Sequence, residues 1–155
     1  MGMDADLSQT PEDFLKMRER ILAEDDMVIG SRYIKGGEQI GKKLIKNLGS
    51  RCMNSIATLT LGIKLKDFTH SFRAFKRTMF IALDAELNER GHPAFQVQFT
   101  FLALRKGFKV SEIPIQFVER EANRGASKLS VKVEVPRYIK IISKLIGLLV
   151  IFISV

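Results

Sequence analysis

A helix signal followed closely by a short apolar run is the feature that most constrains the fold of this chain. Residues 10–13 (TPED) start a helix, with Thr10 and Asp13 as a capping box and Pro11 suited to the first turn. Apolar residues then recur at helical spacing as far as Leu22. The run 27–31 (MVIGS) carries no charge and ends in small residues, as a strand buried on both faces does. A helix that leads into a buried strand predicts an α/β fold with parallel pairing.

The rest of the chain continues in short elements separated by turn residues. We expect a helix from about Ile40 to Leu61 that stops at Gly62. Its expected apolar face consists of Ile40, Leu44, Leu48, Cys52, Ile56 and Leu59. A strand over 72–76, helices over 77–87 and 95–106, and strands within 108–118 follow, with Pro114 indicating an edge position or a bulge. Cys52 is the single cysteine, which excludes an internal disulfide, and we expect a buried core thiol rather than a nucleophile.

Two carboxylates stand almost at the start of the sequence, at Asp4 and Asp6. On an extended backbone, side chains at i and i+2 point to the same face. A pair of hard oxygen ligands on one face suits Mg²⁺ or Mn²⁺ that carries a substrate diphosphate. The plain alternative is a solvated turn. Neither His70 nor His92 has a histidine partner at metal-ligand spacing, so we expect both to be loop residues and expect no zinc.

The charge balance predicts an anionic partner. The formal net charge of the 155 residues is +8, which favours nucleic acid, an anionic membrane or phosphorylated substrates. Between residues 32 and 51 the basic residues are Arg32, Lys35, Lys42, Lys43, Lys46 and Arg51, against the single acid Glu38. A loop over 120–128 adds Arg124, Ser127 and Lys128, which either fold over a phosphate or belong to an ordinary solvent loop. No helix-turn-helix, zinc or RNA-binding signature is visible, so we expect no nucleic-acid partner.

The last 25 residues differ from the rest in composition. Residues 131–144 mix apolar and basic side chains, and residues 145–155 carry no charge. The uncharged run is shorter than the roughly 20 residues of a membrane span, so it predicts an amphipathic interfacial helix that leads into the start of a membrane helix. The basic residues before it would put the preceding domain on the cytoplasmic side. The sequence therefore divides into a domain over 1–130 and a membrane-associated segment over 131–155, unless the last helix simply packs on the domain.

A series of short motifs runs in one order along nearly the whole chain. They are 3–7 (MDADL), 28–33 (VIGSRY) with 35–37 (KGG), 50–54 (SRCMN), Asp67 and Thr69 with 72–75 (FRAF), 95–96 (FQ), 112–115 (EIPI), and Gly125 with 127–130 (SKLS). Together they resemble the polyprenyl-phosphate glycosyltransferases of the dolichyl-phosphate mannose synthase type. These are inverting family-two enzymes that move a sugar from a nucleotide-sugar to a polyprenyl phosphate. The resemblance implies the C-terminal portion of a GT-A, Rossmann-like domain with a mixed sheet.

The resemblance also implies roles for individual residues. It makes Asp4 and Asp6 ligands of the metal that holds the donor diphosphate, and it makes Arg32 and Lys46 ligands of the lipid phosphate. It attributes the catalytic centre to Asp6, Arg32 and Gln98. The wider set of phosphate-binding residues that it implies is Arg32, Lys46, Arg73, Arg124, Ser127 and Lys128.

The chain departs from the family pattern at several places. Ser8 stands where the family often has glutamine, Ser71 replaces a glycine, and Gln98 stands at a position that is commonly glutamate. The family's N-terminal half, with the first strands and the pocket for the base, does not precede Asp4 in this sequence. The alternative is therefore a non-catalytic membrane-surface protein, derived from such a transferase, that binds lipid phosphate.

Overall fold

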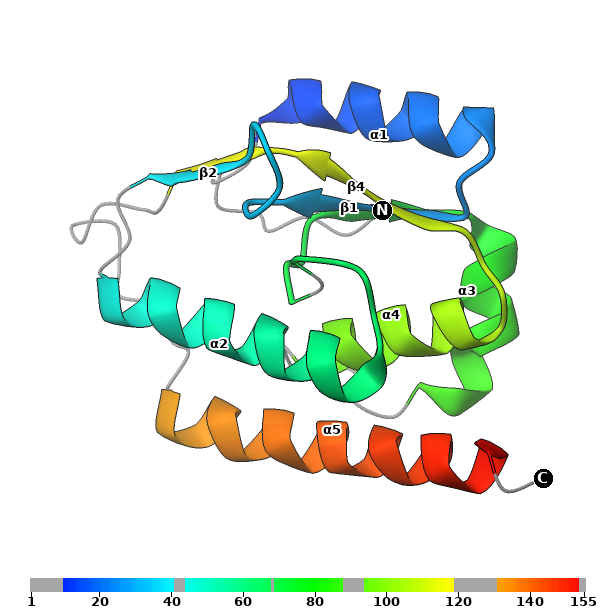
Figure 1. The fold of residues 1–155 in the computed structure, drawn as a ribbon. Helices are drawn as coiled ribbons and strands as arrows, with labels where there is room; N and C mark the ends of the chain where they lie inside the picture. The colour runs from blue at the N-terminus through cyan, green and yellow to red at the C-terminus, as the bar shows by residue number, and fades with distance from the viewer. Residues whose placement is uncertain (1–9, 41–43, 68, 88–93, 119–130, 154–155) are drawn as a thin grey trace.

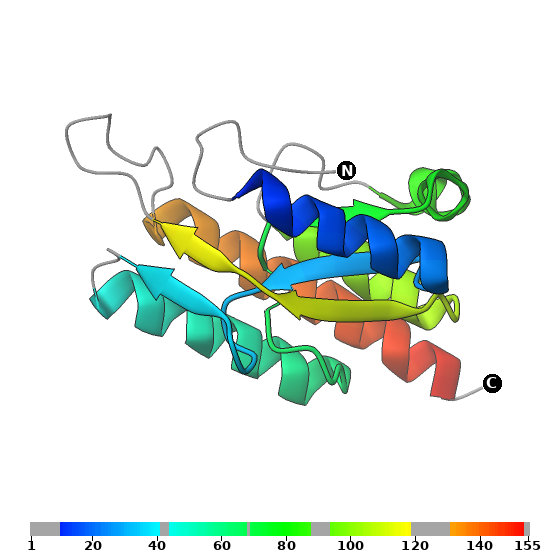
Figure 2. The ribbon, with the colours of Figure 1, turned by 90° about the horizontal axis from the view of Figure 1, so that it is seen from above.

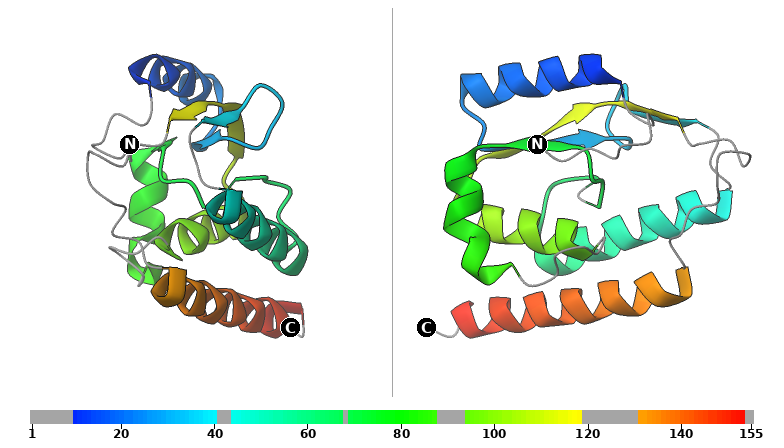
Figure 3. Two further views of the ribbon diagram at one scale, coloured as in Figure 1. Left: turned by 90° about the vertical axis from the view of Figure 1, so that its left-hand side faces the viewer. Right: turned by 180° about the vertical axis from the view of Figure 1, so that it is seen from behind.

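The protein is built in layers around a small sheet, as the computed structural model shows for residues 10–40, 44–67, 69–87, 94–118 and 131–153. Helix α1 (Pro11–Ala23) covers one face of the sheet, and α2 (Leu44–Leu61) and α4 (Ala94–Arg105) lie across the other (Figure 1). Helix α5 (Val131–Ile153) forms a further layer, beyond α2 and α4 and away from the sheet (Figure 3).

Strand β1 (Met27–Ser31) is the centre of the main sheet, in which the strand order is β3-β1-β4. It pairs antiparallel with β3 (Arg73–Phe75) and parallel with β4 (Val110–Pro114). All five residues of β1 are buried, because strands flank it on both sides and helices cover both faces. The predicted strand and its parallel pairing are confirmed, and the mixed sheet is consistent with a GT-A fold.

A second, two-stranded ladder extends the sheet beyond the end of β1. Strand β2 (Glu38–Ile40) pairs parallel with β5 (Gln116–Val118), which continues the path of β4 (Figure 2). Ile115 joins the two ladders: its N–H donates to the Ser31 carbonyl at 3.1 Å, and its own carbonyl accepts from the Glu38 N–H at 2.9 Å. Pro114 therefore ends a strand that, within the described residues, has β1 as its one neighbour, and the predicted edge position is confirmed.

Helix α1 confirms the predicted start and length, but its capping differs from the prediction. Met17 is fully buried and packs with Val28 and Phe72 between α1 and the sheet. The hydroxyl of Thr10 donates to the Asp13 carboxylate at 2.9 Å instead of accepting a backbone N–H, so no capping box forms.

The larger core lies between the other face of the sheet and helix α5. Helix α3 (Arg77–Leu83) leads into a short 3-10 turn, η1 (Asp84–Glu86), where a single longer helix was expected. Every residue of α4 from Val97 to Ala103 is buried, and Gly107 ends the helix at φ +79° as predicted. Helix α5 packs on α2 and α4 through its buried residues Ile141, Ile142 and Leu145.

The prediction for α2 was wrong in two respects, although Gly62 ends the helix as expected, at φ +66°. Ile40 belongs to β2, so the helix begins at Leu44. The expected apolar face is also wrong where the structure describes it, since Cys52 is exposed and Leu59 is 82% exposed. The inward face instead presents Asn54, Ala57 and Leu61, at spacings of three and four residues. The buried polar side chain Asn54 explains this rotation, because it must reach partners inside the protein.

Among the helices in the described ranges, none is both long enough and apolar enough to cross a bilayer. Association of α5 with a membrane surface stays a prediction.

Candidate functional site

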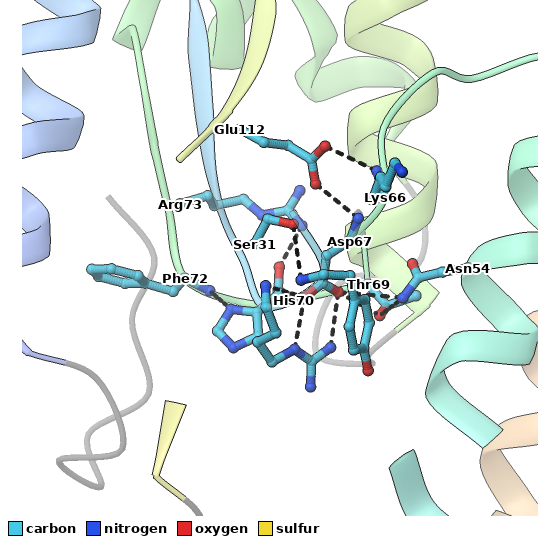
Figure 4. A network of polar contacts seen from close by, with 11 residues as sticks. Ser31, Asn54, Lys66, Asp67, Thr69, His70, Phe72, Arg73 and Glu112 are labelled. Atoms are coloured by element: carbon cyan, nitrogen blue, oxygen red, sulfur yellow. Dashed lines mark hydrogen bonds and ion pairs between the residues drawn. The ribbon is translucent and has the colours of Figure 1, made fainter. Parts of the chain in front are cut away.

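A buried ion pair forms where the chain leaves the C-terminal end of β1. The Arg32 guanidinium donates to Asp67 through Nε at 2.7 Å to Oδ2 and through Nη2 at 2.8 Å to Oδ1. The Arg32 backbone N–H also donates to Oδ2, at 3.1 Å. The Arg32 side chain is 7% exposed and that of Asp67 is fully buried. This two-point contact fixes the plane of the guanidinium, and Asp67 lies at the centre of the network in Figure 4.

Each member of this pair keeps the other charged. Burial alone raises the pKa of the Asp67 carboxyl, but the hydrogen bonds and the positive charge of Arg32 outweigh burial and hold this pKa below its usual range. Burial alone likewise lowers the pKa of Arg32, and Asp67 outweighs it, so that this pKa lies above its ordinary value. The pair is therefore ionised at neutral pH.

Further hydrogen bonds hold Asp67 from α2 and from its own loop. Asn54 Nδ2 on α2 donates to Asp67 Oδ1 at 3.3 Å and to Thr69 Oγ1 at 3.2 Å. The Thr69 hydroxyl donates to Asp67 Oδ1 at 3.4 Å. Figure 4 shows these groups converging on one carboxylate from α2 and the loop. The side-chain amide of Asn54, which points inward from α2, thus has hydrogen-bond partners inside the protein.

An open groove of about 540 Å³ lies beside the ion pair. It is lined by Tyr33, Arg51, Asn54, Ser55, Thr58, Leu59, Lys64, Leu65 and Lys66. Among the described residues that line it, three are cations, Arg51, Lys64 and Lys66, and none is an acid. The guanidinium carbons of Arg32 and Arg51 lie 4.9 Å and 5.2 Å from the centre of the Tyr33 ring. The groove offers positive charge, hydroxyl and amide groups and some apolar wall, which suits a phosphate attached to an organic group.

Arg73 was predicted to bind phosphate and is fully buried on β3. Its Nη1 donates to Thr100 Oγ1 at 2.9 Å and to the Gln96 carbonyl at 3.3 Å, and its Nη2 donates to the His70 carbonyl. Complete burial lowers the pKa of its guanidinium. Arg73 thereby ties the loop before β3 to helix α4, and its predicted contact with phosphate stays a prediction.

His70, expected as an ordinary loop residue, is a buried part of this loop. Its Nδ1 accepts the backbone N–H of Phe72 at 3.1 Å, and its ring meets that of Phe117 edge to face at 5.3 Å. Because Nδ1 accepts a hydrogen bond, the neutral ring carries its proton on Nε2. His70 therefore shapes the chain between Asp67 and β3.

The remaining predicted site residues fall into two groups. Gln98 lies on α4, is buried, and donates through Nε2 to the Glu86 carbonyl at 3.2 Å. Lys46 lies on α2, and its side chain is outside the described part. Also outside it are Asp4, Asp6, Arg124, Ser127 and Lys128. Within the described ranges, no three His, Cys, Asp or Glu side chains gather to hold a metal.

The sequence contains a signal for the burial of Asp67 in the alternation of the residues before it. Ile63 and Leu65 alternate with the exposed Lys64 and Lys66, and Asp67 occupies the next inward position. An acid in the buried phase of such an alternation requires a buried partner. Asn54 gives a similar signal, because it shares its helix face with Ala57 and Leu61.

Comparisons with known proteins point to one family. Residues 1–84 match Glycosyl transferase family 2. The chain is 34% identical over 128 residues to a polyprenol monophosphomannose synthase of Mycolicibacterium smegmatis, covering 83% of this chain and 48% of that protein. It is 36% identical over 128 residues to an undecaprenyl-phosphate mannosyltransferase of Micrococcus luteus, covering 83% of this chain and 51% of that protein. The chain thus spans about half the length of the curated relatives it matches.

The family match includes residues 4 and 6 as well as β1, α2 and the Asp67 loop. The resemblance inferred from the motifs is therefore confirmed. The chain belongs to glycosyl transferase family 2.

Proposed function

We propose that this chain is part of a glycosyltransferase that moves a sugar from a nucleotide-sugar to a polyprenyl phosphate, with inversion at the anomeric carbon. The observation that carries the proposal is the cationic groove beside the Arg32–Asp67 pair, at the C-terminal end of β1. Open α/β sheets bind their ligands at this end of the strands. One relative is named a polyprenol monophosphomannose synthase and the other an undecaprenyl-phosphate mannosyltransferase, so mannose is the first sugar to test.

The chemistry needs orientation and charge more than proton transfer. A phosphate monoester acceptor is anionic at neutral pH, so its oxygen can attack the anomeric carbon without a strong general base. Attack opposite the departing nucleoside diphosphate inverts the configuration. Two anionic substrates repel each other, and side chains that align them and offset this repulsion supply the catalysis.

The residues divide between the two substrates. Arg32 and Lys46 would hold the lipid phosphate, and Arg51, Lys64 and Lys66 in the groove would add positive charge around it. Arg124, Ser127 and Lys128 would close over the phosphates, and Arg73 would add its charge from β3. Gln98, at a position that is commonly glutamate in the family, would orient a substrate by hydrogen bonding, since an amide cannot act as a base at neutral pH.

The two aspartates near the start of the chain are the proposed metal ligands. Carboxylate oxygens at Asp4 and Asp6 are the donor type that Mg²⁺ and Mn²⁺ prefer. When bound, such an ion neutralises the diphosphate leaving group. Asp6 would in addition orient that diphosphate relative to Arg32.

A polyprenyl acceptor is dissolved in a membrane, so the protein must work at a membrane surface. We propose that α5 lies at this interface, with the catalytic domain on the cytoplasmic side. The second candidate function, a non-catalytic protein that binds lipid phosphate, is favoured by one observation: the Gln98 amide donates to the Glu86 carbonyl and carries no charge.

Sugar transfer tests the proposal directly. Radiolabelled nucleotide-sugars, mannose among them, are incubated with undecaprenyl phosphate and Mg²⁺ or Mn²⁺, and label in the lipid phase is counted. The protein is this chain, alone and extended to full length with the remainder of one of its relatives. We expect transfer by the longer form, and at least about a hundredfold loss in its Asp6→Asn variant, as expected when a charge-stabilising group is removed. Absence of transfer with every sugar would contradict catalysis, and binding of undecaprenyl phosphate without transfer would favour the second candidate.

A further inference from the structure

Glu112 on β4 reaches across to the loop that carries Asp67. Its Oε1 accepts the backbone N–H of Asp67 at 2.8 Å, and its Oε2 accepts the backbone N–H of Lys66 at 2.9 Å. The partners are separated by 45 and 46 residues in sequence. One carboxylate thus holds two successive amides, as Figure 4 shows.

This contact fixes the backbone of Asp67, whose side chain makes a separate set of contacts. The Asp67 carboxylate is engaged with Arg32, Asn54 and Thr69. Its backbone N–H is engaged with Glu112. A carboxylate that accepts two N–H groups makes charge-assisted hydrogen bonds, which are stronger than those between neutral groups. Glu112 therefore limits the movement of the Cα of Asp67, and with it the plane of the Arg32 guanidinium.

The strand that carries Glu112 is itself rigidly placed. Strand β4 pairs with β1 along its whole length, and Glu112 stands opposite Ile29 in that ladder, three residues before Arg32. Arg32 and Glu112 are thus held by the same pair of strands, and Asp67 is held between them by side-chain contacts with one and backbone contacts with the other. Arg32, Asp67 and Glu112 are therefore linked to one another and to the paired strands β1 and β4.

We propose that Glu112 is a positioning residue: acting through Asp67, it fixes the Arg32 guanidinium beside the groove. Its second contact, to the Lys66 N–H, holds the segment from which Lys64, Leu65 and Lys66 form one wall of the groove. The expected consequence for lipid phosphate rests on the proposed function, whereas the effect on Arg32 does not. Glu112 touches no substrate in this scheme.

The test compares Glu112→Gln with Glu19→Gln, which removes the same charge from an exposed position on α1, on the far side of the sheet. A glutamine keeps one carbonyl oxygen for one N–H but turns an NH₂ group toward the other. Hydrogen exchange, measured by NMR, follows the amides of Lys66 and Asp67 and the Nε–H of Arg32. We expect exchange at these three sites to rise about tenfold or more in Glu112→Gln, as loss of a charge-assisted hydrogen bond implies. Glu19→Gln should leave it unchanged.

The exchange pattern separates positioning from a general loss of stability. Positioning predicts changes confined to Lys66, Asp67 and Arg32, whereas general destabilisation raises exchange equally at β1 amides such as that of Val28. Unchanged exchange at Arg32, or a uniform rise, overturns the inference. Where Glu112→Gln does not fold, Glu112→Asp keeps the charge and withdraws it by one methylene, and the same three sites should exchange faster.

A ligand measurement then joins the inference to the proposed function. Farnesyl phosphate, a soluble short polyprenyl phosphate, is titrated into the wild type and each variant. We expect about tenfold weaker binding in Glu112→Gln, since that factor corresponds to about 1.4 kcal/mol, the loss of one charged hydrogen bond. Equal binding by wild type and Glu112→Gln would overturn the positioning of the phosphate site. Faster exchange at Arg32 with no binding by any protein would support the role of Glu112 and contradict the proposed function instead.

Discussion

Two ion pairs have nearly equal N–O distances, but one is buried and the other is exposed. Comparing them shows how burial changes the contribution of an ion pair to stability. The Arg32–Asp67 pair has an N–O distance of 2.7 Å and side chains at most 7% exposed. The Lys109–Glu24 pair, at 2.6 Å, has side chains 55% and 76% exposed. Removing one partner of a buried pair leaves an uncompensated charge, so Asp67→Asn should lower the free energy of unfolding by about 3–5 kcal/mol. Urea unfolding measures it, with Glu24→Gln as the control that should show no measurable change. Similar losses in the two variants would contradict this assignment.

The lowered pKa of Asp67 makes part of the stability depend on pH. Because the folded-state pKa lies below the unfolded value, the stabilisation is complete above the unfolded pKa and is lost as the pH falls through the folded one. We expect the wild type to exceed Asp67→Asn in free energy of unfolding by a constant amount above about pH 4, and by less below it. The pKa of Asp26 is also lowered, by the Lys109 N–H and by Lys76. Asp26 is present in both proteins, so its contribution cancels in the difference between their free energies of unfolding. A difference that persists unchanged to pH 2 would show that Asp67 is not the group responsible.

At the residue scale, the sequence predicted one half of the site. Arg32 follows directly from β1, so an apolar run of five residues was enough to put it at the ligand-binding end of the sheet. Asp67 is 35 residues away in sequence, and no local pattern names its partner. The inward alternation of Ile63, Leu65 and Asp67 indicates only that a partner must exist. The contact of Glu112 with two backbone amides has no sequence signal, because any loop supplies N–H groups.

At the scale of elements, β1 and its neighbours leave no room for a side chain at Gly30. A Cβ there would lie 2.8 Å from Phe72 Cδ1 and 2.9 Å from Ile115 Cδ1. Gly30→Ala should therefore lower the free energy of unfolding by about 1–3 kcal/mol, the usual cost of overpacking a core. Gly147 on α5 has no atom within 4 Å of the same position, so Gly147→Ala should raise stability by about 0.5–1 kcal/mol by favouring the helix. Both are measured by urea unfolding, and stabilisation by Gly30→Ala would contradict the packing of β1.

Helix α5 gives a second prediction at this scale. Leu145 is fully buried, whereas Ile139 is 56% exposed on the same helix. Leu145→Ala should lower the free energy of unfolding by about 2–5 kcal/mol, since it leaves a cavity against α2 and α4. Ile139→Ala should change it by less than about 0.5 kcal/mol. If neither variant alters the unfolding transition in water without lipid, α5 does not pack on the domain under those conditions.

Elements with strong local signals were predicted well, and elements set by distant contacts were not. Pro11 and Gly107 mark helix ends by their own backbone preferences, so α1 begins and α4 ends as expected. The face of α2 that points inward depends on Asn54 reaching Asp67, a contact made outside the helix. Ile40 was assigned to that helix because it is apolar, but its partner in β5 lies 78 residues further on, at Val118. Hydrophobic spacing alone does not reveal such pairing.

At the scale of the whole molecule, the net charge of +8 must be separated from the location of that charge. Lys64 and Lys66 line the groove below the sheet, whereas Arg18 on α1 and Arg77 on α3 are exposed elsewhere. Replacing the two lysines by glutamate lowers the net charge by the same amount as replacing the two arginines by glutamate. A uniform attraction to an anionic surface depends on total charge, and a docking face depends on which residues carry it.

We predict that the chain floats with vesicles containing phosphatidylglycerol, and that Lys64→Glu/Lys66→Glu weakens this binding much more than Arg18→Glu/Arg77→Glu. Both lysines belong to the wall beside Arg32, where the lipid phosphate is proposed to bind, so reversal there repels the bilayer from the face that must approach it. Raising the salt to 1 M reduces the Debye length to about 3 Å and should remove the difference between the variants. Any binding that remains then comes from apolar contact, for which α5 is the candidate. Equal loss in the two variants would attribute the attraction to net charge alone, and equal flotation with neutral phosphatidylcholine would attribute it to apolar contact.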